Sequence, residues 1–115
     1  MARIVVADND VDALDLVLTD LRLEGHEVHG APDAAGAESL VHALSPDVVV
    51  LDYRMPPGDD GLTLAARLVG ADADLRVVIY SNYQSAELRA RAAAIGVPFL
   101  AKGNLRVLRS AVTAR

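Results

Sequence analysis

Side chains that support phosphoryl transfer follow short apolar runs in this sequence: carboxylates at Asp8 and Asp52, a hydroxyl at Ser81 and an ammonium at Lys102. An aspartate can attack a phosphoryl group as a nucleophile, and fixed positive charge offsets the charge on the transferred oxygens. Two carboxylates held close together repel each other unless a cation lies between them, and oxygen ligands without His or Cys suit magnesium. The residue types therefore predict a magnesium-assisted site at which Asp52 accepts a phosphoryl group.

The position of Asp52 follows from the run Asp47–Asp52, which reads D-V-V-V-L-D and precedes the turn residues of Met55–Gly61. A continuous apolar run bounded by turn residues is typical of a strand buried on both faces, in the middle of a parallel sheet. Ligands of such sheets gather beyond the carboxyl ends of the strands. We therefore expect Asp52 to lie at the functional edge of the sheet.

The elements that position these residues alternate along the whole chain. Apolar runs predict strands over residues 4–7, 27–30, 47–52, 75–80 and 97–101, and apolar residues at helical spacing follow each of them. Asp33 and Ser85 are the expected caps of two helices, and Gly25 and Gly96 the expected stops. Five strands that alternate with five helices predict an α/β fold with a parallel sheet covered on both faces.

In a sheet of order 2-1-3-4-5, the first and third strands are neighbours and their loops diverge to open a crevice. That order would place Asp8 opposite Asp52, with Ser81 and Lys102 on the far side of Asp52. We expect one domain over residues 1–115, with no output domain in the chain.

Composition narrows the class of protein. The net charge of −5 argues against a nucleic-acid-binding face, and the absence of cysteine excludes disulfides and thiolate metal sites. The N-terminal apolar stretch is too short for a signal peptide or a membrane span, so a soluble cytoplasmic protein is expected.

The sequence resembles the receiver domains of bacterial response regulators in two-component signalling, over essentially its whole length. The matching pieces, in order, are Asp8-Asn9-Asp10, Leu51–Pro56, Gly61-Leu62, Val78–Ser81 and Phe99–Lys102. The resemblance implies a flavodoxin-like doubly wound (βα)5 fold of order 2-1-3-4-5. It also implies that the chain is a phosphoacceptor that promotes its own phosphorylation and dephosphorylation, and not a turnover enzyme.

The resemblance assigns roles to individual residues. Asp52 would accept a phosphoryl group from a histidine kinase or phosphotransfer protein. Magnesium would be held by Asp8, Asn9, Asp52 and the backbone carbonyl of Arg54. Lys102 would supply positive charge, Ser81 would hydrogen-bond the phosphoryl group, and the rotamer of Phe99 would follow its state. The fourth helix, fifth strand and fifth helix would contact a downstream protein or a second copy of the chain.

The chain departs from the family pattern around the metal. The family places two adjacent acids after the first strand, whereas the pair here is either Asp8-Asn9 or, in another alignment, Ala7-Asp8. One charge is lost either way unless Asp10 compensates, so weaker magnesium binding is expected. The segment from Gly96 to Lys102 is also one residue shorter than usual, and Gly103 stands where the family has a proline.

Two alternatives follow from the residues. A pseudo-receiver would use the same fold for protein interaction without phosphorylation. A haloacid-dehalogenase-like phosphatase would use Asp8 as nucleophile and Asp10 as general acid, but the acidic motif expected after Lys102 is missing, since residues 103–115 contain no acid.

Overall fold

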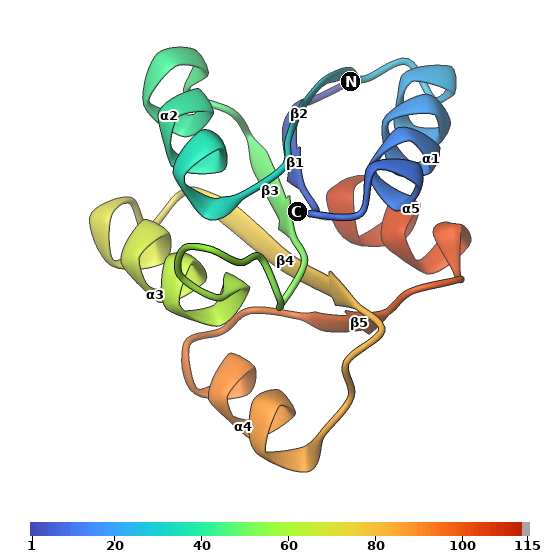
Figure 1. Ribbon diagram of the computed structural model, residues 1–115. Coiled ribbons are helices and arrows are strands. Elements are labelled where there is room, and N and C mark those ends of the chain that lie inside the picture. The colour runs from blue at the N-terminus through green and yellow to red at the C-terminus, as the bar shows by residue number, and fades with distance from the viewer. Residues whose placement is uncertain (114–115) are drawn as a thin grey trace.

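The computed structural model describes residues 1–113 as alternating strands and helices (Figure 1). The elements are β1 (Arg3–Ala7), α1 (Val11–Leu23), β2 (Glu27–Ala31), α2 (Ala34–Leu44), β3 (Val48–Leu51), α3 (Gly61–Ala71), β4 (Arg76–Ser81), α4 (Ala86–Ala94), β5 (Phe99–Ala101) and α5 (Leu105–Thr113). Residues 114 and 115 of the expected domain lie outside the described residues. Within residues 1–113, none of the helices has the length and apolarity needed to cross a membrane.

The strands form one parallel sheet of order β2-β1-β3-β4-β5, which confirms the predicted topology. Helices α1 and α5 lie together on one face, and α2, α3 and α4 lie on the other (Figure 1). Both faces are apolar because β3 is buried throughout, with Val49 and Leu51 in the α2–α4 layer and Val48 and Val50 in the α1–α5 layer. This arrangement is the reason that the strand reads as a continuous apolar run.

Polar side chains define where the helices begin. Asp33 and Ser85 accept hydrogen bonds from Gly36 N and Leu88 N, as the sequence predicts, and Asp60 accepts one from Thr63 N. The Asp10 carboxylate accepts hydrogen bonds from Asp12 N and Ala13 N at the start of α1. Each cap of this kind stabilises a helix by about 0.5–2 kcal/mol.

The last helix is tied to the first by a two-pronged ion pair. The Arg109 guanidinium donates from Nε and Nη2 to the two Asp20 carboxylate oxygens, each at 2.9 Å. Beneath this pair, Leu108 and Val112 of α5 share one apolar cluster with Val17 and Leu21 of α1. Helix α5 therefore covers part of α1 as well as the sheet.

The fifth strand is shorter than the expected 97–101 and starts at Phe99. The Val97 N–H donates to Ala92 O, at the end of α4, and Pro98 has no N–H to give to the sheet. A residue without an N–H is tolerated here because β5 is the outermost strand of the sheet.

Candidate functional site

The carboxyl ends of four strands bring the predicted side chains together. Asp8 follows β1, Asp52 follows β3, Ser81 ends β4 and Lys102 follows β5. A pocket of about 280 Å³ opens there, lined by Asn9, Asp10, Asp52, Arg54, Ser81, Asn82, Tyr83 and Lys102. Asp8, Asp52 and Ser81 are the polar residues that the fold buries within residues 1–113. Burying charged and polar side chains lowers the stability of a fold, so such groups are usually buried where they serve a function. We therefore take this cluster as the candidate site.

Lys102 lies between the two aspartates rather than only beyond Asp52. Its Nζ is 2.6 Å from Asp8 Oδ2 and 3.2 Å from Asp52 Oδ2. The other oxygens accept from the backbone, Asp8 Oδ1 from Asp10 N at 2.9 Å and Asp52 Oδ1 from Tyr53 N at 2.8 Å. Every carboxylate oxygen of the pair therefore has a protein partner.

The charges at the site do not balance. Burial raises the pKa of Asp8, and the nearby charge of Asp52 raises it further, although the hydrogen bonds from Lys102 and Asp10 N act in the opposite direction. Burial also acts to lower the pKa of Lys102, but its hydrogen bond to Asp8 and the charge of Asp52 outweigh burial, and the pKa is raised. Lys102 thus stays protonated, and its single charge faces two carboxylates. The site favours a further cation.

The donors around this space are all oxygen atoms, which fits magnesium. Asn9, Asp52 and Arg54 line the same pocket, beside Asp8. Asp10 also lines the pocket, with its Oδ1 engaged by Asp12 N and Ala13 N at the start of α1. Residues 1–113 contain no group of three His, Cys, Asp or Glu side chains arranged for a metal. The residues fit a magnesium ion with one carboxylate fewer than the family pattern.

Ser81 is 1% exposed and faces the pocket from the end of β4. Its Oγ accepts a hydrogen bond from Tyr83 N at 3.0 Å, which leaves its own proton free to be donated. Its carbonyl oxygen accepts from Lys102 N at 3.1 Å and from Gln84 Nε2 at 3.0 Å. Ser81 therefore connects the site to the loop before α4.

That loop reaches Phe99 through Arg89, a connection that the sequence analysis missed. The Arg89 guanidinium donates to Gln84 Oε1 and to Phe99 O, and it lies 5.5 Å from the centre of the Phe99 ring. Phe99 itself is 9% exposed and packs in the core. No local sequence pattern predicts the contact between Gln84 and Arg89, because it depends on the rotamers of two long side chains.

An aromatic stack, also missed, covers one side of the pocket. The rings of Tyr53 and Tyr83 stack with centroids 5.5 Å apart, and the Arg54 guanidinium lies 4.5 Å from the Tyr83 ring centre. The sequence contains one indication of this stack: tyrosine is rare in the chain, and two of its three tyrosines follow strands that end at the site.

Gly61 packs closely against the backbone of the phosphoacceptor segment, Asp52 and Tyr53. Its N–H donates to Tyr53 O at 2.7 Å, and a Cβ at this residue would lie 2.0 Å from the Asp52 carbonyl oxygen. In the sequence, Gly61 stands out only as part of the Gly61-Leu62 motif, which does not reveal this close approach. On the other side of Lys102, the peptide to Gly103 is not cis, since the cis bond found in residues 1–113 joins Pro56 and Pro57. Gly103 instead adopts a φ of 101°, which suits glycine.

Comparisons with known proteins agree with this geometry. The family described as response regulator receiver domain matches residues 4–113. The transcriptional regulatory protein PrrA of Mycobacterium leprae is 39% identical over 89 residues, which are 76% of this chain and 37% of that protein. The probable transcriptional regulatory protein NarL of Mycobacterium tuberculosis is 39% identical over 83 residues, 70% of this chain and 38% of that protein. The chain thus spans well under half the length of these relatives.

Solved structures show the same fold. The non-phosphorylated receiver domain of HemR from Leptospira biflexa has a TM-score of 0.89 and 25% identity, covering 100% of this chain and 97% of that one. NtrX from Brucella abortus has a TM-score of 0.85 and 31% identity, covering 96% of this chain and 27% of that one. The phosphatase interpretation is set aside, because the family match follows the receiver pattern over residues 4–113.

Proposed function

Because the chain belongs to the response regulator receiver domain family, we propose that Asp52 accepts a phosphoryl group from a histidine kinase or phosphotransfer protein in a bacterial cytoplasm. The observation that carries this proposal is the pairing of Asp8 and Asp52 with one buried ammonium, that of Lys102. Such a cluster is costly to bury as a purely structural feature, and it supplies the nucleophile and the fixed positive charge that the transfer needs.

In the proposed step, an Asp52 carboxylate oxygen forms a bond to phosphorus as the bond from phosphorus to the donor nitrogen breaks. The donor imidazole leaves as a neutral group after taking up a proton. Lys102 stays protonated and offsets charge on the phosphoryl oxygens, and the Ser81 hydroxyl donates its proton to one of them. Magnesium, when bound by Asp8, Asn9, Asp52 and the Arg54 carbonyl, adds charge compensation.

The proposed output follows the contacts of Ser81. When the Ser81 side chain turns toward a phosphoryl oxygen, Tyr83 N loses its present acceptor, Ser81 Oγ, in the loop that also carries Gln84. Arg89, which contacts Phe99, transmits this change to β5. The surface formed by α4, β5 and α5 then changes its shape, and a downstream protein or a second copy of the chain binds to it. In this proposal the chain is a switch that is modified and reset, and not a turnover enzyme.

A phosphodonor assay tests the function directly. With acetyl phosphate or phosphoramidate and magnesium, we expect intact-protein mass spectrometry to show a gain of one phosphoryl group in wild type and none in Asp52→Asn. Asp59→Asn, at an exposed carboxylate, is the matched control and should still be modified. Unmodified wild type under these conditions would favour the pseudo-receiver, in which Asn9 has removed the metal function.

Restoring the second acid tests the metal assignment. We expect Asn9→Asp to tighten magnesium binding at least about fivefold, because one added charge near 4 Å contributes about 1–4 kcal/mol between the limits of water and a protein surface. Isothermal titration with magnesium measures the change. Asn104→Asp adds the same charge outside the pocket and should leave the affinity within about twofold. Equal affinities of wild type and Asn9→Asp for magnesium would show that residue 9 is not a ligand of the metal.

A further inference from the structure

The turn after β5 carries Lys102, the only lysine of the chain, and departs from the family pattern. Where the family has a proline, whose ring fixes φ, this chain has Gly103, which is exposed and adopts a φ of 101°. Glycine has the widest choice of backbone conformations, so this turn does not by itself hold Lys102 in one orientation. A contact from elsewhere in the fold has to supply that constraint.

Two adjacent residues at the end of β4 hold the backbone on both sides of Lys102. The Lys102 N–H donates to the carbonyl oxygen of Ser81 at 3.1 Å. The Gly103 N–H, a group that proline lacks, donates to the Tyr80 hydroxyl at 3.0 Å. The second bond fixes the plane of the peptide between Lys102 and Gly103. Because side-chain rotamers depend on the backbone dihedrals, this plane also limits where the Lys102 side chain can point.

The Tyr80 hydroxyl is a fixed acceptor because its ring belongs to the core. Side chains alternate along β4, so Tyr80 lies in the layer under α1 and α5 while Ser81 faces the Asp52 pocket. Tyr80 is 5% exposed and shares its apolar cluster with Leu108 of α5. A ring that is packed in this way brings its hydroxyl to one place, and the mobile peptide is the partner that adapts.

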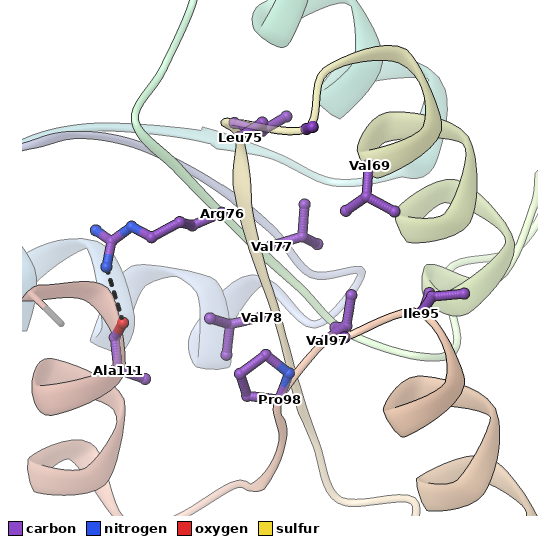
Figure 2. Close-up of a pocket in the computed structure, with 11 residues that line it drawn as sticks. Val69, Leu75, Arg76, Val77, Val78, Ile95, Val97, Pro98 and Ala111 are labelled. Atoms are coloured by element: carbon purple, nitrogen blue, oxygen red, sulfur yellow. Dashed lines mark hydrogen bonds between the residues drawn. The ribbon is translucent and has the colours of Figure 1, made fainter. Parts of the chain in front are cut away.

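Helix α5 is tied to the same strand at its other end. At the start of β4, the Arg76 guanidinium donates to Ala111 O and to Val112 O, at 3.5 and 2.6 Å. Figure 2 shows the bond to Ala111 beside a pocket of about 520 Å³, at the end of the sheet opposite to Asp52. Arg76 therefore acts far from the site, whereas Tyr80 acts where the chain leaves the site. The two contacts can be removed separately.

We propose that the Tyr80 hydroxyl positions Lys102 by holding the peptide between Lys102 and Gly103 in one orientation. That orientation directs the ammonium to the two buried aspartates, 2.6 Å from Asp8 Oδ2 and 3.2 Å from Asp52 Oδ2. Tyr80 thus constrains a turn that a proline constrains in the family pattern. Its effect on phosphoryl transfer rests on the proposed function, whereas its hold on Lys102 does not.

Tyr80→Phe in the full chain tests the proposal, because it keeps the ring and removes the hydroxyl. Lysine labelled with ¹³C at Cε reports on Lys102 alone, since the chain has no other lysine. In wild type we expect two distinct Hε signals in the NMR spectrum, because a side chain held in one rotamer places these protons in different surroundings. In Tyr80→Phe they should move toward one averaged signal, and the Gly103 amide should exchange about three- to tenfold faster. Phosphorylation by phosphoramidate should slow at least about twofold.

Arg76→Met is the matched control, because it loosens α5 from β4 at the end away from Lys102. It should lower the urea midpoint and leave the Hε signals and the phosphorylation rate as in wild type. Unchanged Hε signals in Tyr80→Phe, or an equal change in Arg76→Met, would overturn the proposal. The Hε signals are measured without a phosphodonor. A wild type that takes up no phosphoryl group therefore contradicts the proposed function, and the signals still decide on Tyr80.

Discussion

Gly61→Ala is expected to destabilise the fold by about 3 kcal/mol or more, at the upper end for an overpacked site. The added Cβ would lie 2.0 Å from the carbonyl oxygen of Asp52 and 2.9 Å from its carbonyl carbon. These are backbone atoms, so no rotamer change relieves the contact, and either α3 or the end of β3 has to move. We expect a lower urea midpoint and loss of phosphorylation in whatever fraction stays folded.

Gly70→Ala is the matched control within the same helix. No atom lies within 4 Å of a Cβ at Gly70, and alanine is favoured over glycine inside a helix by about 0.5–1 kcal/mol. This variant should therefore be as stable as wild type or more stable, with unchanged phosphorylation. If the two variants unfold at the same urea concentration, the close approach of Gly61 to Asp52 is not a constraint.

Lys102→Met should be the second damaging change, because it leaves two buried carboxylates without their shared cation. Removing one partner of a buried charge cluster costs about 3 kcal/mol or more at neutral pH. The pKa of Asp8 is already raised, so the folded chain holds its proton to higher pH than the unfolded chain does. Stability is therefore lost as the pH rises from the ordinary value of 3.8 through the folded pKa, and the variant should extend this loss to higher pH.

Urea denaturation of Lys102→Met across pH 4–8 measures this effect, which should shrink toward the acidic end. Adding Asp8→Asn removes one of the two charges and should restore most of the lost stability. The double variant should remain poor at accepting a phosphoryl group, because no ammonium faces Asp52. A double variant as unstable as Lys102→Met would show that packing of the lysine chain, and not charge, is what matters.

The fold was predictable from the sequence because its signals are local. The apolar run before Asp52 places β3 in the middle of the sheet, and the capping side chains of Asp33 and Ser85 set helix starts. The meeting of Asp8, Asp52, Ser81 and Lys102 then follows from parallel strands ending at one edge. The shortened β5 was missed, since it depends on a hydrogen bond that Val97 makes to α4.

Contacts between long side chains were out of reach of this reasoning. Lys102 was expected beyond Asp52, yet its Nζ lies 2.6 Å from Asp8 Oδ2 and 3.2 Å from Asp52 Oδ2, because the flexible lysine chain can reach back between the two carboxylates. The link from Arg89 to Phe99 likewise depends on rotamers that no spacing encodes. The role of Gly61 depends on a distance between backbones that meet only in the folded chain.

The ion pair between Asp20 and Arg109 has a consequence for the order of events during synthesis. The two residues are 89 positions apart, so α1 leaves the ribosome long before its partner helix exists. Until then Val17 and Leu21 have no cover from Leu108 and Val112. Contacts at such long separation slow folding, and the uncovered apolar face is open to other chains meanwhile. The domain therefore reaches its native state only when its final helix has been made.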